Sequence, residues 1–142
     1  MNAEQAGVEI LTRGADYALR AMAVLAKRRE AAPTPVRRIA GEAGVAEAML
    51  RKLLQKLTRA RLVVSVRGIA GGFRLGRPPG EIAFLDVIEA VQGPVAMNRC
   101  FLGWPCRNRQ SCSVRRKLGG IQRRLVASLR DATLAGPAEG VR

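Results

Sequence analysis

Apolar residues recur at helical spacing near the start of the chain. From Thr12, the segment TRGADYALRAMAVLAKRRE places Ala18, Met22 and Leu25 on one face, with charged residues elsewhere. An amphipathic pattern with this period predicts a helix. Pro33 and Pro35 end it, because proline cannot continue a helix and suits the start of the next one.

Two short amphipathic segments follow in VRRIAGEAGVAEAMLRKLLQKL, separated at Gly44. Ala40 is small where two helices would cross closely, and Gly44 can adopt a turn conformation that other residues resist. Val45 and Leu50 can close the small core between the helices. This pattern is typical of a helix-turn-helix, although it also fits other helical hairpins.

Residues 61–78, RLVVSVRGIAGGFRLGRP, alternate apolar and polar positions on both sides of a glycine-bearing tip. The alternation predicts a two-stranded hairpin with Leu62, Val64 and Val66 on one face. A helix-turn-helix followed directly by a hairpin is a winged helix. The glycines do not have the spacing of a nucleotide-binding loop.

The remaining sequence predicts two further helices. A short one in AFLDVIEAVQG ends at Gly93, and a long one begins at Ser113. The long helix carries one apolar stripe, formed by Val114, Leu118, Ile121, Leu125, Leu129 and Ala132. Such a stripe needs a partner surface, and a second copy of the chain is the simplest one. Packing back on its own domain is the alternative. Gly119 and Gly120 each weaken the helix by ~1 kcal/mol relative to Ala, and the sequence gives no firm reason for them beyond a close approach of another backbone.

We therefore expect a mainly α fold with a small β-hairpin wing. A winged helix-turn-helix domain would occupy residues 11–92, a cysteine-bearing loop residues 93–112, and a dimerisation helix residues 113–134. Residues 1–10 and 135–142 read as flexible tails.

The composition adds a strong positive charge to this picture. The 142 residues include 25 Lys and Arg against 11 Asp and Glu, a net charge of +14. A polyanionic partner is expected, with nucleic acid first and an acidic membrane surface second. The apolar runs are shorter than the ~18 residues of a spanning helix, and residues 1–10 do not resemble a secretory signal. We expect a cytoplasmic protein with no membrane partner.

All three cysteines lie in the loop CFLGWPCRNRQSC, and the chain has no histidine. Buried, inert thiols are not expected in a loop that contains Gly, Pro, Asn and Arg. A disulfide switch would leave one cysteine over, and a closed zinc site would lack a fourth N or S ligand. Iron-sulfur clusters take thiolates readily, and a carboxylate or another subunit can supply the fourth ligand.

The surroundings of the thiols favour an anionic inorganic centre. Five arginines flank them: Arg99, Arg107, Arg109, Arg115 and Arg116. Cys112 falls at the start of the long helix, where the dipole and free N–H groups stabilise a thiolate. Spacing and charge leave both an iron-sulfur cluster and a disulfide switch open.

The assembled pattern resembles the Rrf-type family of winged-helix transcriptional regulators, which includes IscR-like and NsrR-like iron-sulfur proteins. The resemblance covers roughly residues 11–134. It rests on LTRGADYALRAMAVLA, RRIAGEAGVAEAMLRKLLQKLTRARLVVSVRGIAGGFRLGR, IAFLDVIEAVQG and the Cys-x5-Cys-x5-Cys loop. It implies a homodimer crossed through the C-terminal helices and bound to palindromic double-stranded DNA. Each subunit would hold one cluster through Cys100, Cys106 and Cys112.

The fourth cluster ligand differs among the members of this family. IscR-like members use a histidine shortly after the third cysteine, where this chain has Arg115. The NsrR-like arrangement takes an aspartate from the first helix of the other subunit, and Asp16 matches that position. The resemblance thus implies Asp16 as fourth ligand, with 4Fe-4S favoured and 2Fe-2S as the alternative. Nitric oxide, redox state or iron supply would be the signal.

The winged helix also indicates where DNA would bind. The front of the recognition helix can reach base edges, the wing can touch a groove or phosphates, and the preceding helix can touch the backbone. The expected DNA-contacting residues are Arg37, Arg38, Glu47, Ala48, Met49, Arg51, Lys52, Arg67 and Arg74.

Two rival functions fit the sequence less well. An enzyme with a cysteine nucleophile would lack a histidine base, and no paired-acid site is evident, so we expect no enzyme and no small-molecule substrate. One Trp, one Tyr and three Phe leave few stacking platforms for RNA. The remaining alternative is a transcriptional regulator that uses its cysteines as a cluster-free thiol redox switch.

Overall fold

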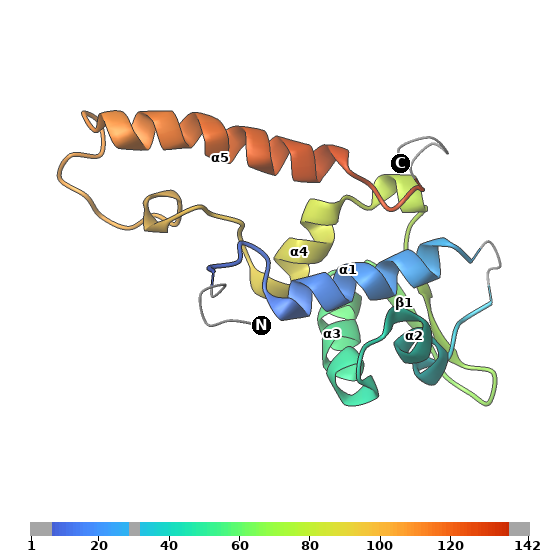
Figure 1. Cartoon of the computed structure of the whole chain (residues 1–142). Helices are drawn as coiled ribbons and strands as arrows, with labels where there is room; N and C mark the ends of the chain where they lie inside the picture. Colours follow the sequence, from blue (N-terminus) through green and yellow to red (C-terminus); the bar gives the residue numbers. More distant parts are fainter. Residues whose placement is uncertain (1–6, 29–31, 137–142) are drawn as a thin grey trace.

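The computed structural model describes residues 7–28 and 32–136 (Figure 1). Most of each expected tail, residues 1–6 and 137–142, lies outside the described residues. The helices and strands follow the order α1 (Arg13–Ala26), α2 (Val36–Ala43), α3 (Glu47–Arg59), β1 (Val63–Val66), β2 (Gly72–Leu75), α4 (Phe84–Gln92) and α5 (Ser113–Asp131). Short 3-10 turns occupy Pro79–Glu81 and Arg99–Phe101. The expected mainly α fold with a small β wing is confirmed.

Helix α1 is the centre of the fold. The Thr12 hydroxyl caps it by accepting a hydrogen bond from the backbone N–H of Ala15. Its apolar face is buried against α2, α3 and α4, and includes the predicted Ala18, Met22 and Leu25. Figure 1 shows α1 running between α5 on one side and the pair α2 and α3 on the other.

Helices α2 and α3 form the predicted helix-turn-helix. Gly44 ends α2 with φ 68°, a left-handed conformation that favours glycine. Val45 then donates its backbone N–H to the carbonyl of Ala40 at 3.1 Å. Val45, Ala40 and Leu50 are all buried, so the small core closes as the sequence predicts.

The wing is an antiparallel pair in which Val63 faces Leu75 and Val66 faces Gly72. Thr34 extends it by exchanging two backbone hydrogen bonds of 2.8 Å with Phe73. The predicted face of Leu62, Val64 and Val66 is only partly right, because Val63 is buried and Val64 is exposed. The strand leaves the helical core at Val63, so the residues beyond it have no layer to pack against.

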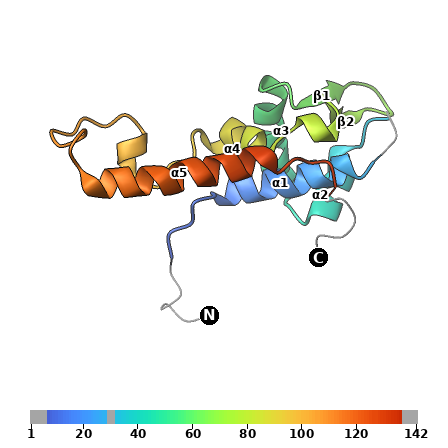
Figure 2. The same cartoon turned by 90° about the horizontal axis from the view of Figure 1, so that it is seen from above.

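Helix α5 has two unlike halves. Leu125, Val126 and Leu129 in its second half pack against a cluster that includes Leu85 and Ile88 of α4. The chain then returns to the body, where Phe84 N–H donates to Ala132 O at 2.7 Å and Leu134 N–H donates to Ile82 O at 2.9 Å. The first half of α5 and the loop before it extend beyond the rest of the chain (Figures 1 and 2). The second half of α5 therefore packs on its own domain, whereas the first half is left exposed.

None of the helices in the described ranges combines the length and apolar character needed to cross a membrane.

Candidate DNA interface and cysteine loop

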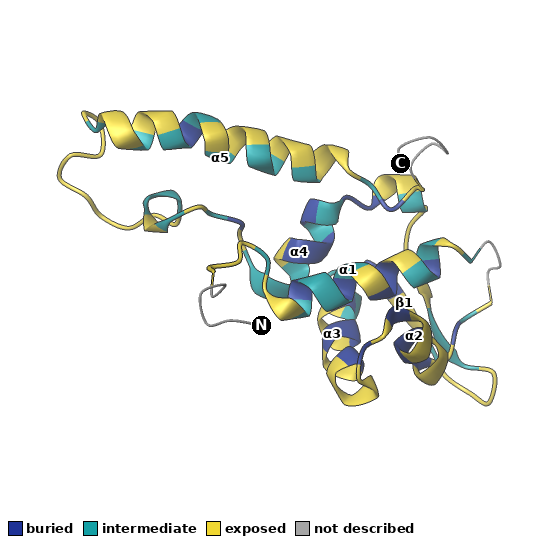
Figure 3. Cartoon of the chain, in the orientation of Figure 1, coloured by how far each residue is buried: buried dark blue, intermediate teal, exposed yellow. Residues whose placement is uncertain are grey.

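The recognition helix α3 divides cleanly between core and surface. Leu50, Leu53, Leu54 and Leu57 are buried. The predicted DNA-contacting positions on α3 are all exposed, namely Glu47, Ala48, Met49, Arg51 and Lys52, on the yellow face of the helix in Figure 3. Arg51 is held by an ion pair with Glu47 at 2.7 Å, one helical turn away. The exposed face can therefore present both a fixed cation and a carboxylate to base edges.

A surface hollow of about 400 Å³ lies between the start of α2, the start of α3 and the wing. It brings together Arg37 of α2, Glu47 and Arg51 of α3, and Arg67 of the wing, from three separate segments of the sequence. The backbone of the wing tip, at Gly68 and Gly71, lines the same hollow. These predicted residues thus form one continuous surface.

Two other predicted DNA-contacting residues lie elsewhere. Arg38 lines a second hollow of about 600 Å³, together with Lys27 and Arg28 at the end of α1. Arg74, on the exposed side of β2, lines a third hollow together with Arg28 and Arg77. The sequence analysis does not include Lys27 and Arg28 among the expected DNA contacts, although both belong to the basic run that precedes Pro33.

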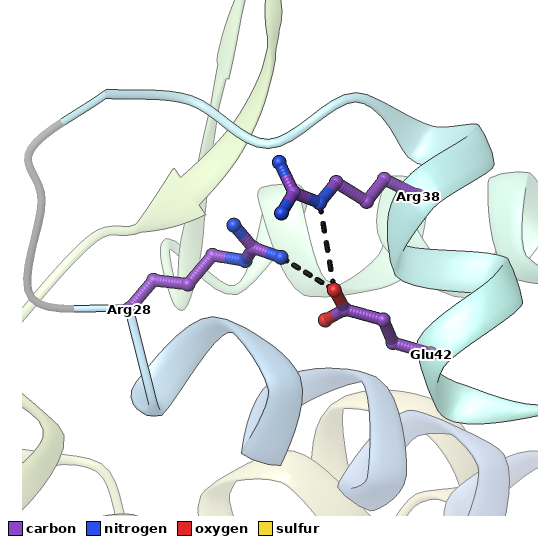
Figure 4. Close-up of polar contacts among 3 residues, drawn as sticks. All are labelled: Arg28, Arg38 and Glu42. Atoms are coloured by element: carbon purple, nitrogen blue, oxygen red, sulfur yellow. Dashed lines mark hydrogen bonds and ion pairs between the residues drawn. The ribbon is translucent and has the colours of Figure 1, made fainter.

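Glu42 links α1 to α2 at the edge of the second hollow (Figure 4). Its Oε1 accepts a hydrogen bond from Nη2 of Arg28 at 2.7 Å and one from Nε of Arg38 at 3.4 Å. The bond from Arg28 is the main cause that holds the pKa of Glu42 below its ordinary value, and the charges of both arginines add to it against a desolvation effect. The carboxylate is therefore ionised and neutralises part of the local positive charge.

The three cysteines sit in three different local structures. Cys100 lies in the Arg99–Phe101 turn, where its N–H donates to the side chain of Asn98. Cys106 is exposed at the start of the next turn. Cys112 is the N-cap of α5, and its Sγ accepts the backbone N–H of Arg115 at 3.4 Å. All three are free thiols.

Helix α5 anchors the loop. The Gln122 side chain donates to the carbonyl of Val95 at 2.6 Å and accepts the N–H of Met97 at 2.9 Å. Phe101 lies over Gly119, the buried residue of α5, and the Arg115 guanidinium lies 5.9 Å from the Phe101 ring centre. A Cβ at Gly119 would meet the Phe101 ring at 3.8 Å, an ordinary van der Waals contact, so the packing of the loop does not require a glycine there, and nothing in the structure explains Gly120.

The donor chemistry of the loop fits an iron-sulfur cluster, since soft thiolates are its usual ligands and nearby arginines offset the negative charge. Within the described ranges, however, no three Cys, Asp or Glu side chains gather closely enough to hold a metal ion. Asp16 lies on α1, pairs with Arg20 at 3.0 Å and lines a hollow with Glu9, Arg13 and Tyr17. One chain alone does not bring Asp16 to the cysteines.

Comparison with known proteins places this chain among transcriptional regulators. Residues 11–138 match the family model Rrf2, described as an iron-dependent transcriptional regulator. The chain is 34% identical over 124 residues to the HTH-type transcriptional regulator IscR of Cronobacter sakazakii, an alignment that covers 87% of this chain and 76% of that protein. The IscR of Citrobacter koseri is 35% identical over the same extent.

Solved structures show the same fold. CymR of B. subtilis, described as the global cysteine regulator, is 27% identical with a TM-score of 0.76, covering 90% of this chain and 94% of that one. IscR of T. potens is 27% identical with a TM-score of 0.70, covering 94% and 87%. The oxidized form of Staphylococcus aureus CymR is 26% identical with a TM-score of 0.71, covering 95% and 99%.

Proposed function

The chain belongs to the Rrf2 family of DNA-binding transcriptional regulators, which are not enzymes, and from this premise we propose that an iron-sulfur cluster controls its affinity for DNA. The protein would act as a homodimer on a palindromic operator. Residues 11–92 would form the DNA-binding domain, residues 93–112 the cluster-binding loop and residues 113–134 the dimerisation helix.

The observation that carries this proposal is the group of free thiols in a loop anchored to α5. Cys100, Cys106 and Cys112 would hold the cluster, which supplies a centre that oxidants or nitric oxide can attack. The Sγ of Cys112 accepts the backbone N–H of Arg115 at the start of α5. A change at Cys112 would act directly on α5 and, through Gln122, on the loop.

Asp16 of the other subunit is the proposed fourth ligand. Its carboxylate is half-exposed and held only by a surface ion pair with Arg20, which costs little to break. A carboxylate binds a soft iron-sulfide centre less firmly than a thiolate does, so the cluster would be labile at this position. A 4Fe-4S cluster is favoured, with 2Fe-2S as the alternative.

The first half of α5 would form the dimer interface. Val114 and Ile121 are exposed there at 62% and 43%, and Leu118 is half-buried. Leu125 and Leu129 belong to the same stripe but already pack on the chain's own core. The proposed interface would bring one subunit's α1 toward the other subunit's loop, as an Asp16 ligand requires.

DNA contacts would come from the hollow between α2, α3 and the wing. Arg37, Arg51 and Arg67 meet there around Glu47, and Ala48, Met49 and Lys52 extend the surface along α3. Arg38 and Arg74 would touch phosphates at the sides of this surface.

Native mass spectrometry of protein purified without oxygen tests the proposal, together with visible absorption before and after nitric oxide. We expect a dimer with one cluster per subunit that reacts with nitric oxide. Asp16→Ala should shorten the cluster lifetime without preventing dimer formation, and Glu9→Ala, from the same hollow, is the matched control. Protein without iron and sulfide, in which cysteine substitutions left DNA binding unchanged, would contradict the proposal.

The second candidate is a cluster-free thiol switch, favoured by the structural likeness to CymR and its oxidized form. The exposed Cys106 would be its first thiol to react. Mild oxidant would then join two of the three cysteines in a reversible disulfide and change DNA affinity in iron-free protein.

A further inference from the structure

The second hollow, between the end of α1 and the start of α2, is a positively charged surface that shares only Arg38 with the DNA contacts proposed above. Its described lining consists of Lys27, Arg28, Ala32, Pro33, Thr34, Pro35 and Arg38. Three of these side chains are cations, and no described lining residue is an acid. We propose that this hollow binds a phosphate of the DNA backbone and that Glu42 limits its affinity by occupying the arginines in the free protein.

The position of the hollow supports a DNA occupant. Pro35 lines both this hollow and the one that holds Arg37, Arg51 and Arg67. The two hollows therefore adjoin at the first turn of α2, and a DNA strand that passes the recognition helix can continue toward Lys27.

The donors of the arginines are only partly used. Each guanidinium carries five N–H donors, and Glu42 accepts one from Arg28 and one from Arg38. In the described part of the chain, Nε of Arg28 is buried without a hydrogen-bond partner. A phosphate can thus bind Arg28 and Arg38 beside Glu42 or in its place, while Lys27 adds a mobile charge.

The negative charge of Glu42 predicts opposite changes in DNA affinity for two kinds of substitution. The Glu42 carboxylate repels a phosphate and offsets one of the two positive charges of Arg28 and Arg38 that would bind it. Removing this charge should strengthen DNA binding, whereas removing a cation should weaken it. A mere structural role for the Arg28–Glu42–Arg38 cluster would weaken binding in every variant.

The experiment measures the affinity of the full-length protein for mixed-sequence double-stranded DNA as a function of salt. Lys27→Gln should weaken binding about three- to tenfold and reduce the slope of log K against log salt by about 0.9 for each phosphate that is no longer neutralised. Glu42→Gln should bind more tightly than wild type with a steeper slope. The matched control is Arg130→Gln, which also removes one positive charge, but from the last turn of α5. In Figure 1 this helix lies on the other side of α1 from α2.

Arg28→Gln is a weaker test, because Arg28 also ties α1 to α2. Lys27 makes no ion pair in the described structure, and Glu42→Gln is expected to gain affinity, which a folding defect cannot produce. If Lys27→Gln matches Arg130→Gln and Glu42→Gln gains nothing, the inference is wrong. A wild-type protein that did not bind DNA at all would instead refute the DNA-binding function on which the inference rests.

Discussion

Glu42 shows, at the scale of single residues, how one carboxylate can order two cations. It joins Arg28, just beyond the end of α1, to Arg38 of α2, and the two arginines meet at one oxygen although they are separated along the chain. Glu42 is the acid of this cluster, and its bonds to the arginines hold its pKa below the ordinary value.

The lowered pKa of Glu42 predicts a pH-dependent stability. Because the folded-state pKa is below the unfolded one, the contribution is fully present above the unfolded value and is lost as pH falls through the folded value. Wild type should therefore unfold at higher urea than Glu42→Gln at pH 7, and the gap should close in acid. Equal midpoints at pH 7 would contradict this.

Two glycines in the DNA-binding region should respond oppositely to alanine. A Cβ on Gly72 would collide with the backbone carbonyl of Thr34, so Gly72→Ala should destabilise the wing. A Cβ on Gly41, within α2, meets nothing within 4 Å, so Gly41→Ala should stabilise the chain by about 0.5–1 kcal/mol through helix propensity. Thermal unfolding of both variants checks the prediction, and a stable Gly72→Ala variant would refute the close pairing of Thr34 with β2.

At the scale of elements, α5 acts as a support for the cysteine loop. Gln122 bonds Val95 and Met97, Gly119 receives Phe101, and Cys112 caps the helix. The loop is therefore tied to α5 at its start, middle and end, although it has little regular structure of its own.

Removing the Gln122 ties should free the loop. In iron-free protein, Gln122→Leu should raise the labelling rate of the half-buried Cys100 several-fold toward that of the exposed Cys106, because local opening controls access to a half-buried thiol. Mass spectrometry after timed alkylation measures both rates. Gln110→Leu, at an exposed loop position, is the control; an unchanged Cys100 rate in Gln122→Leu would show that these ties do not hold the loop.

At the scale of the whole molecule, the cysteine loop extends away from the winged helix, past the start of α1, whereas α2 and the wing lie toward the end of α1 (Figure 1). Helices α4 and α5 connect the loop to the winged helix. Helix α4 packs on both α1 and α3, and α5 in turn packs on α4. A signal at the loop would thus reach DNA by moving whole helices or subunits against one another.

The exposed first half of α5 predicts how the subunits assemble. Ile121→Arg should shift the protein from dimer to monomer, because a charge would replace an exposed apolar residue in the proposed interface. Sedimentation velocity measures the mass, and unfolding experiments should show that the fold is retained. Ala127→Arg, exposed on another side of α5, is the control; a dimer in both variants would place the interface elsewhere.

Much of the fold was predictable because its signals are local. The periodicity of apolar residues marks α1 to α5, Gly44 and Gly93 mark helix ends, and the glycine-bearing alternation marks the wing. The buried strand residue was not predictable in the same way. Alternation predicted Leu62 and Val64 on a common face, but Leu62 and Val63 are both buried and Val64 is exposed. Which strand residues reach the core depends on the elements that pack around the strand.

The sequence by itself determined the helices, the turn, the wing and the excess of positive charge, because each follows from neighbouring residues or from composition, and the resemblance of its motifs indicated the family. Only the tertiary structure decided which cations share a surface. Arg37 and Arg38 are adjacent in sequence but line different hollows, since successive residues on a helix point about 100° apart. Arg38 meets Lys27, Arg28 and Glu42 because α1 packs against α2, and no local pattern encodes that contact.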